Sequence, residues 1–310
     1  ASARGADRRR PSRVPPHGGI LAVDKPKGPT SHDVVQRVRR LLGDRRVGHT
    51  GTLDPMASGL LLLCCGPATR LSNFLVGMDK SYTAILRLGV ETDTLDAEGD
   101  VVTEDDAWRG LTPEAVRRAA AALEGPGEQI PPAYSAKKVG GEAAHRRVRR
   151  GERVELDAVP VVVHRCEVTE VRLPEVELST RVSSGTFVRS LGRDLASALG
   201  TCGHLVALRR TAVGEVLESW ASELDELEAM KDELPWIAPL DALPHLPLVE
   251  VDADEARRIG MGQRVRLGTP SADAEPVRVA LRGCLVAVGA VRDGVLHPKK
   301  VFLQPDEVGA

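Results

Sequence analysis

The six residues Leu60–Cys65, "LLLLCC", form the longest continuous apolar run in this chain of 310 residues. A run of this length, bounded by glycines, is typical of a strand that must be buried. It is far shorter than the roughly 18 apolar residues that a membrane helix requires. Because 310 residues is long for one compact core, we expect a large domain that buries this strand and a smaller second domain.

The residues before this strand, 46–59, read "RVGHTGTLDPMASG" and place one carboxylate, Asp54, among glycines, threonines and a serine. Local chemistry alone explains Asp54 as a turn residue before Pro55. The stretch lacks the Gly-Lys-Ser/Thr of a P-loop and the spaced glycines of a dinucleotide fold, so a phosphate cradle fits it poorly. The residue pattern leaves open whether this carboxylate is structural or functional.

Strand and helix patterns alternate over residues 18–240 without a regular βαβ repeat, which predicts an α+β domain. Its first helix follows a strand and a Pro/Gly turn, with a capping box from Thr30 to Asp33 and Gly43 as the C-cap. Further strands are predicted at 81–90 and 176–183, and further helices at 112–123 and 187–199. After the proline-rich segment 234–250, short strand patterns with glycine turns predict a small β-rich domain over 247–310.

The net charge of −2 hides a strong asymmetry along the chain. Residues 1–50 contain twelve Lys/Arg and four Asp/Glu, and residues 137–153 contain seven and two. Residues 215–241, by contrast, contain nine acidic groups and one lysine. Local basic blocks on a nearly neutral chain favour a defined surface for a polyanion, although a solvated arginine-rich surface would have the same composition.

Several features indicate the cellular setting and argue against bound metal. Segment 1–17 is rich in Arg and Pro and has no apolar h-region, which favours a flexible basic tail over a secretory signal. The five cysteines include no Cys-x-x-Cys pair, so neither a disulfide framework nor a zinc knuckle is indicated. Residues 91–100, "ETDTLDAEGD", miss the spacing of a calcium-binding EF-hand and are better explained as a polar turn. We therefore expect a cytoplasmic protein without metal or membrane segment.

Five long motifs carry a family resemblance. They read "GILAVDKPKGPTSHDVV", "VGHTGTLDPMASGLLLLCCGPATRLSNFL", "DKSYTAILRLGVETDTLDAEG", "PPAYSAKKVGG" and "SSGTFVRSLGRDLASALGTCGHLVALRRTAVG". In their order and spacing they resemble the bacterial TruB family, the tRNA pseudouridine-55 synthases, over residues 18 to about 215. The resemblance implies a mixed, largely antiparallel sheet of the pseudouridine synthase type, a PUA-like C-terminal domain, and an isomerase that needs no cofactor.

The resemblance also implies roles for particular residues. Asp54 matches the family's catalytic aspartate, Arg189 the arginine that pairs with it, and Tyr82 the tyrosine that stacks on the target base. A catalytic role would explain the turn, because small residues let a nucleotide approach the carboxylate closely. Without the motifs, Arg189 would be explained equally well as a helix-surface residue and Tyr82 as a core aromatic.

Three further positions are weaker matches. His49 matches the histidine that supports the flipped nucleotide, although a helix-cap or core histidine is an alternative. Leu208 matches a position that lines the pocket, with plain core packing as the alternative. Phe187 departs from the family pattern, since many relatives carry tyrosine there, and any hydrogen bond from that hydroxyl is lost.

Residues 135–151 combine a Gly-Gly hinge with six cations and correspond to the family's RNA-gripping insertion. The cations are Lys137, Lys138, Arg146, Arg147, Arg149 and Arg150. Like charges in one segment repel one another unless a polyanion is present, so we expect a mobile loop that closes on RNA. A solvated helix is the alternative for this segment.

The predicted function is therefore that of a monomeric tRNA pseudouridine-55 synthase that flips a T-loop uridine into a pocket. Its predicted partner is the T arm of tRNA. A non-catalytic tRNA-binding or folding module would also explain the basic blocks, and a hydrolase using Asp54 would release free uracil. The sequence leaves open whether the aspartate attacks the uracil C6, attacks the ribose C1′ or assists an elimination.

Overall fold

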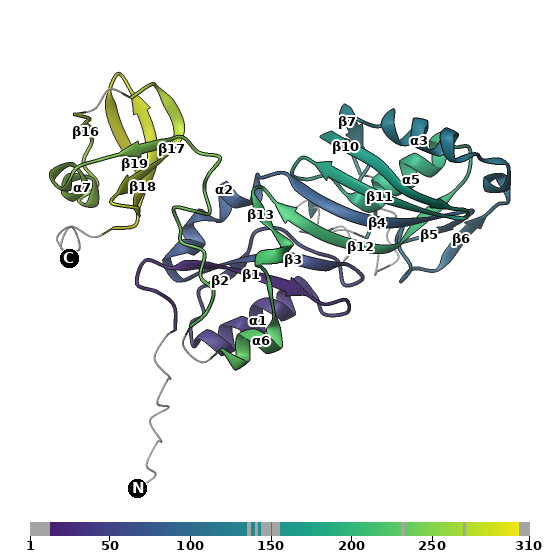
Figure 1. Cartoon of the computed structure of the whole chain (residues 1–310), viewed down its shortest axis with the longest axis horizontal. Helices are drawn as coiled ribbons and strands as arrows, with labels where there is room; N and C mark the ends of the chain where they lie inside the picture. Colours follow the sequence, from purple (N-terminus) through teal and green to yellow (C-terminus); the bar gives the residue numbers. More distant parts are fainter. Residues whose placement is uncertain are drawn as a thin grey trace, which may run out of the picture.

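Strand β3 (Ser58–Cys65), which holds the long apolar run, lies inside a ten-stranded mixed sheet (Figure 1). The computed structural model describes residues 13–134, 150, 156–230, 233–268 and 271–303, and only the backbone of 138–139 and 142–143. Along the sheet the order is β14-β1-β3-β12-β4-β11-β10-β7, with β13 beside β12 and β2 beside β3. The pairs β1–β14 and β3–β12 are parallel and the others antiparallel, which confirms the predicted sheet type.

The other strands of this sheet are β1 (Gly19–Lys25), β2 (Val47–His49), β4 (Lys80–Leu88), β7 (Gly125–Gln129), β10 (Val159–Arg172), β11 (Glu175–Val182), β12 (Gly203–Val213), β13 (Val216–Leu217) and β14 (Ser222–Glu223). Two small hairpins accompany it: β5 (Val90–Thr92) with β6 (Val101–Glu104), and β8 (Lys138–Val139) with β9 (Glu142–Ala143). The helices are α1 (Ser31–Leu42), α2 (Ser72–Val76), α3 (Pro113–Ala121), α5 (Val188–Ala198), α6 (Leu224–Ala229) and α7 (Ala253–Gly260), with 3-10 turns η1 (Gly66–Leu71), η2 (Ala107–Gly110) and η3 (Glu218–Trp220).

Burial on both faces explains why β3 is apolar throughout. Leu61, Leu63 and Cys65 enter one hydrophobic cluster together with α1, α3 and α5. The alternate residues Leu60 and Leu62 enter a second cluster, formed with α2, η1, the proline-rich segment and the C-terminal sheet. Because successive side chains of a strand point to opposite faces, a strand covered on both sides cannot alternate with polar residues.

The first helix confirms the local predictions. The Thr30 side chain accepts a hydrogen bond from the Asp33 backbone N–H, and the Asp33 carboxylate accepts one from the Thr30 N–H. Gly43 follows the helix with φ 65°, in the left-handed region that favours glycine. Together these caps fix both ends of a helix whose first turn lies beside the Asp54 turn.

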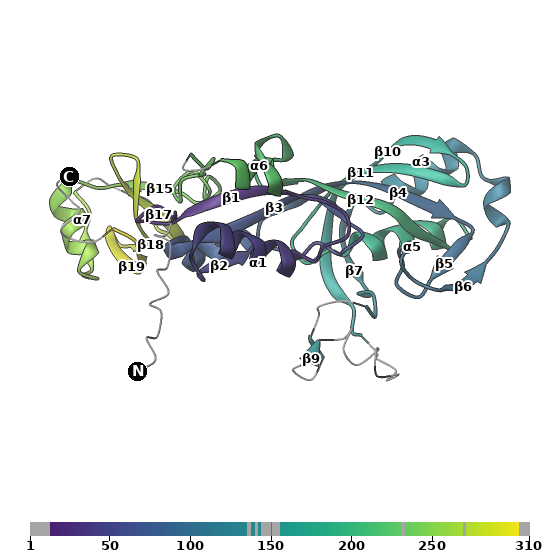
Figure 2. The ribbon, with the colours of Figure 1, turned by 90° about the horizontal axis from the view of Figure 1, so that it is seen from below.

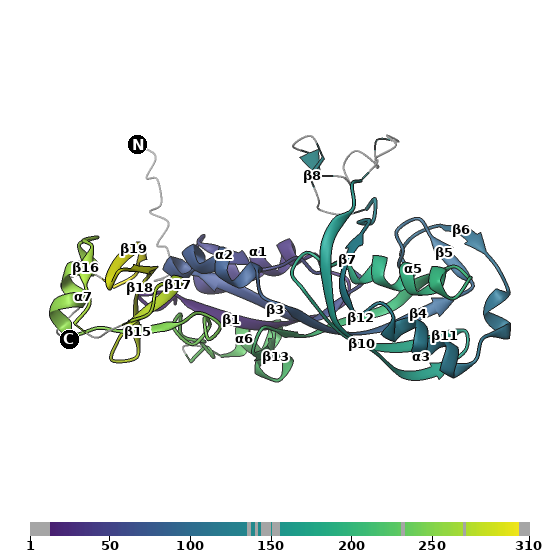
Figure 3. The same cartoon turned by 90° about the horizontal axis from the view of Figure 1, so that it is seen from above.

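The C-terminal part forms a five-stranded sheet with the order β15-β17-β18-β19-β16 and its own hydrophobic cluster. Its strands are β15 (Leu248–Glu250), β16 (Val265–Arg266), β17 (Ala274–Leu281), β18 (Cys284–Arg292) and β19 (Val295–Val301). It also contacts η1 and α2, since the Arg70 guanidinium lies 5.0 Å from the Phe302 ring centroid and the Lys300 ammonium 5.1 Å from that of Phe74. Figures 2 and 3 show this sheet and the β5–β6 hairpin at opposite ends of an elongated molecule.

The described part of the expected N-terminal tail, residues 13–17, contacts the body of the protein. The Arg13 N–H donates to the Leu42 carbonyl at 3.0 Å, and Val14 packs against the core. Residues 1–12 lie outside the described residues.

All five cysteines are free thiols. None of the described helices combines the length and the apolar character that crossing a membrane requires.

Candidate active site

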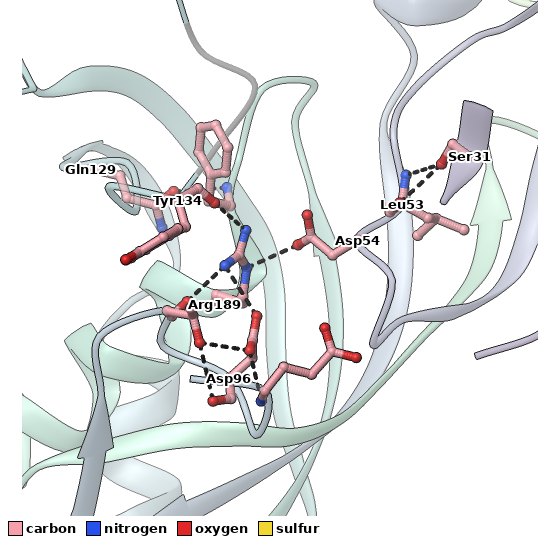
Figure 4. Close-up of polar contacts among 10 residues, drawn as sticks. Ser31, Leu53, Asp54, Asp96, Gln129, Tyr134 and Arg189 are labelled. Carbon is pink, nitrogen blue, oxygen red and sulfur yellow. Dashed lines mark hydrogen bonds and ion pairs between the residues drawn. The ribbon is translucent and has the colours of Figure 1, made fainter. Parts of the chain in front are cut away.

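The turn that carries Asp54 is held against the start of α1 (Figure 4). The Ser31 hydroxyl donates to the Leu53 carbonyl at 2.9 Å and accepts from the Leu53 N–H at 2.8 Å. The Ala57 N–H closes the turn by donating to the Asp54 carbonyl at 3.0 Å. The backbone on both sides of Asp54 is therefore fixed, and its carboxylate has a defined position.

Arg189, at the start of α5, uses all three guanidinium nitrogens (Figure 4). Its Nε pairs with Asp54 Oδ2 at 2.9 Å, and its Nη1 pairs with Asp96 Oδ2 at 3.1 Å. Nη1 also donates to the Thr94 carbonyl at 2.7 Å, and Nη2 donates to the Tyr134 carbonyl at 2.9 Å. Four acceptors thus fix a guanidinium that is only 5% exposed, and the helix-surface alternative for Arg189 does not apply.

The ionisation of Asp54 reflects opposing effects. Burial raises the pKa of Asp54 above its ordinary value, and the nearby Asp96 carboxylate raises it further. The Arg189 guanidinium opposes this rise by favouring the ionised form. The result is a carboxylate that is 35% exposed and whose negative charge is stabilised first by Arg189 and then by Lys25, an arrangement suited to a nucleophile or a base.

Asp54 and Arg189 line a cavity of about 290 Å³, and three other residues predicted from the sequence line it with them. These are Tyr82 on β4, Phe187 just before α5, and Leu208 on β12. Tyr82 and Leu208 are each 7% exposed and also belong to the hydrophobic core. Both side chains therefore line the cavity and pack into the hydrophobic core at the same time.

His49 and the basic loop stand apart from this group. His49 lies on β2 and is not among the residues that line the cavity. Burial, reinforced by Arg210, lowers the pKa of His49 and so favours the neutral imidazole. Of the loop, Arg150 is an exposed turn residue and Lys138 is described only by its backbone. The predictions for Lys137, Arg146, Arg147 and Arg149 fall outside the described residues.

Asp96 is a site residue that sequence reasoning missed. It lies in "ETDTLDAEGD", which we interpreted as a polar turn, and its Oδ1 accepts hydrogen bonds from the Thr94 hydroxyl and the Glu98 N–H at 2.7 and 3.0 Å. The described residues contain no group of three or more metal-ligating side chains. The sequence itself offered only an aspartate within an acidic turn as a signal. The partner of that aspartate, Arg189, lies 93 residues further along the chain.

Three cations close to the Asp54 turn were also missed. Lys25 is fully buried and its Nζ donates to the Ala57 carbonyl at 2.7 Å; burial lowers the pKa of Lys25 to about 8, against the opposing effect of Asp54. Lys80 and Arg210 line the cavity itself. The motifs "DKPKG", "DKSY" and "ALRR" contain these residues, but basic residues in a sequence are normally exposed.

Three family models match successive parts of the chain. The model for the TruB family pseudouridylate synthase N-terminal domain matches residues 39–188, that for the tRNA pseudouridylate synthase B C-terminal domain matches 189–243, and that for the pseudouridine synthase II TruB C-terminal region matches 247–302. The chain belongs to the TruB family. The resemblance found in the motifs is thereby confirmed, and so is the prediction of an RNA-modifying isomerase.

Individual relatives of this TruB chain agree. A tRNA pseudouridine synthase B of Arthrobacter sp. (strain FB24) is 46% identical over 302 residues, which cover 93% of this chain and 98% of the relative. Another, from Thermobifida fusca (strain YX), is 45% identical over 293 residues, covering 92% and 98%. Among solved structures, a Cbf5-Nop10-Gar1 complex matches with a TM-score of 0.73 at 23% identity, covering 99% of this chain and 93% of the other. That match shows a common fold.

The Asp96 contact leads to a first prediction. In Asp96→Asn, Arg189 still pairs with Asp54, but the guanidinium loses its ion pair with the buried carboxylate of residue 96. We expect the rate of the chemical step to fall about 10- to 100-fold, because small displacements of a catalytic pair cost this much. Single-turnover kinetics on RNA would measure it. Asp93→Asn is the matched control, since the Asp93 carboxylate accepts a hydrogen bond from the Asp100 N–H in the same turn. Equal rates for the two variants would contradict a positioning role.

Proposed function

We propose that this TruB family member is a tRNA pseudouridine-55 synthase that isomerises a uridine of the T loop. The observation that carries the proposal is the Asp54–Arg189 ion pair in a cavity that Tyr82 also lines. The relatives named tRNA pseudouridine synthase B, at 45 to 46% identity over nearly their whole length, support tRNA as the substrate. We also propose that it acts as a monomer in the cytoplasm.

The reaction requires that the target base leave the RNA stack, at a cost of a few kcal/mol. Stacking of the uracil on Tyr82 offsets about 1 to 3 kcal/mol of that cost, and Leu208 adds apolar contact. Phe187 offers the base only an apolar ring. Inside the cavity the N1–C1′ bond breaks, the uracil turns, and a C5–C1′ bond forms while the C5 hydrogen is lost and N1 takes a proton.

Asp54 acts as a carboxylate in each of the three chemical routes, which are addition at C6, attack at C1′ and assisted elimination. Arg189 maintains its charge and direction through the 2.9 Å contact. Lys25 adds a second positive charge near Asp54 and, like Arg189, opposes the rise of the Asp54 pKa, which favours the ionised carboxylate.

We further propose that two regions outside the cavity hold the RNA backbone. The first is the loop 135–151. The second is the C-terminal region 247–310, where the arginines around α7 and β16 are exposed: Arg257, Arg258, Arg264 and Arg266. Each phosphate contact contributes about 0.7 to 0.9 to the slope of log affinity against log salt, so together they would make RNA binding strongly salt-dependent.

The decisive experiment uses a T-arm stem-loop transcript labelled with tritium at uridine C5. We expect tritium release, with pseudouridine appearing in the nucleoside digest in equal amount. A transcript with cytidine at the target position is the control. Release of free uracil would indicate a hydrolase, and tight binding without either product would indicate a non-catalytic tRNA-binding module.

The pKa of Asp54 predicts the acid side of the pH profile. Because burial raises the pKa of Asp54, the carboxylate takes up its proton at a higher pH than an exposed aspartate would, and the nucleophile is lost as the pH falls through that value. We expect kcat/KM to fall with one proton on the acid side, above about pH 3.9, because kcat/KM reports the pKa of the free enzyme. Circular dichroism at each pH would verify folding. A flat profile down to pH 4 with folded protein would contradict the prediction.

A further inference from the structure

Two buried cations, Lys80 and Arg210, line the cavity that contains Asp54. Lys80 is 8% exposed and its Nζ donates to the Met78 and Val76 carbonyls at 2.6 and 2.9 Å. Arg210 is 1% exposed. Among the described residues, neither side chain forms an ion pair with a carboxylate, in contrast to Arg189. A buried charge without a counterion is costly, so its retention requires an explanation.

Both cations have donors left for the cavity. Arg210 Nε donates to the Leu60 carbonyl at 2.7 Å and Nη2 to the Gly51 carbonyl at 3.1 Å, which leaves Nη1. Lys80 has three ammonium donors and uses two. Burial, together with the nearby Arg210, lowers the pKa of Lys80 to about 8. The preceding residue, Asp79, opposes this decrease only in part. An anion between the two would satisfy the free donors.

The backbone of Gly51 leaves space at the point where the cations meet. A Cβ placed on Gly51 would lie 3.4 Å from Lys80 Cε and 3.5 Å from Arg210 Nη1. The space is not filled because glycine has no side chain. The φ of Gly51 is 155°, at the edge of the region that favours glycine. The end of the Lys80 side chain and the Arg210 guanidinium therefore both approach the backbone of Gly51 in the cavity wall.

This position lies beside the proposed base site. Lys80 precedes Tyr82 by two residues on the same face of β4, about 6.6 Å along the strand. Arg210 is the direct partner of Tyr82 across the β4–β12 register. A group bound by both cations would therefore lie beside a uracil stacked on Tyr82, on the same face of the sheet.

We propose that Lys80 and Arg210 form an anion subsite that binds a phosphodiester group of the flipped uridine nucleotide. The proposal rests on the proposed function, because the phosphate belongs to the nucleotide that reacts at Asp54. The substrate then supplies a counterion that none of the described carboxylates provides through an ion pair, and a lysine and an arginine fork together match a phosphate. Binding at this subsite would hold the ribose while the base turns.

The test combines protein and RNA changes. Lys80→Gln is assayed under single turnover on three T-arm stem-loops: an unmodified one, and two with one neutral methylphosphonate 5′ or 3′ of the target uridine. On unmodified RNA we expect the half-saturating concentration to rise on the order of tenfold, as for loss of a charge-assisted hydrogen bond. On one of the modified RNAs, the variant and the wild type should differ less than about twofold, because the charge that Lys80 binds is already absent.

Controls separate this from a structural role. Lys80→Arg should retain most of the affinity, and Arg172→Gln, at an exposed arginine that pairs with Glu170, should leave all three half-saturating concentrations unchanged. An equal loss for Lys80→Gln on all three RNAs would show that the lysine acts only within the protein and would overturn the subsite. If Lys80→Gln does not fold, the three RNAs are compared with the wild type alone. The subsite requires that one of the two methylphosphonate RNAs have a higher half-saturating concentration than the unmodified RNA, and equal values for all three would overturn it.

A second measurement does not depend on turnover. The melting temperature is compared in sodium phosphate and in sodium chloride of equal ionic strength, for wild type and Lys80→Gln. We expect phosphate to stabilise the wild type more than the variant, because a ligand that binds only the folded state raises its stability. Equal stabilisation would contradict the subsite. Phosphate stabilisation through Lys80 without pseudouridine formation would instead show that the proposed function had failed.

Discussion

Replacing Asp54 with asparagine is expected to reduce pseudouridine formation below detection and to change the affinity for T-arm RNA little. Asparagine keeps the shape of the side chain but cannot act as an anionic nucleophile or base. Arg189 would still be held by Asp96 and two backbone carbonyls, so the site should remain assembled. Phosphate contacts dominate RNA affinity and do not involve this carboxylate.

Tritium release over extended times would measure the residual activity of this variant, and filter binding its affinity. The matched control is Asp24→Asn, because Asp24 is also ion-paired, with Arg209 at 2.7 Å, and is 26% exposed against 35% for Asp54. Asp24 does not line the cavity. If Asp54→Asn kept a tenth of the wild-type activity, the catalytic assignment would be wrong.

Arg189→Lys is expected to lower the single-turnover rate about 100- to 1000-fold although the charge is conserved. The arginine reaches two carboxylates and two carbonyls with three nitrogens in one plane. A lysine ammonium is a single point and lacks the planar fork, so it cannot hold Asp54 and Asp96 in the same geometry. RNA affinity should stay within a few-fold.

Arg193→Lys is the control for this substitution, because Arg193 lies four residues further along α5 and pairs with Asp194 rather than with Asp54. It tests whether loss of an arginine from this helix is harmful in general. Single-turnover rates and melting temperatures of both variants would be compared. A rate for Arg189→Lys within threefold of the wild type would remove the ion pair from the mechanism.

Patterns within a few residues predicted the local structure correctly. The capping box at Thr30 was predicted because its contacts join residues three positions apart, and the glycine cap at Gly43 because its left-handed φ of 65° suits glycine. The helix over 187–199 was predicted to within one residue at each end from its apolar period. The continuous apolar run predicted a buried strand, and its position between two hydrophobic clusters explains why no polar residue interrupts it.

The family motifs went further and pointed to the site. Asp54, Tyr82, Phe187, Arg189 and Leu208 were identified from motifs, and the structure places all five around one cavity. Their catalytic and binding roles remain proposals. His49, identified in the same way, lies on β2 outside the lining of that cavity.

By itself, then, the sequence determined several of the helices and strands, the α+β class, the family and the residue at which the chemistry is proposed. Only the tertiary structure decided which charges are paired. Asp96 meets Arg189 across 93 residues, and the β4–β12 register pairs Arg210 with Tyr82 and so brings it near Lys80, without any local pattern that marks these contacts. The physical reason is that burial and pairing of a charge depend on which strands become neighbours, and the cost or gain of a charge is set by those neighbours rather than by its place in the chain.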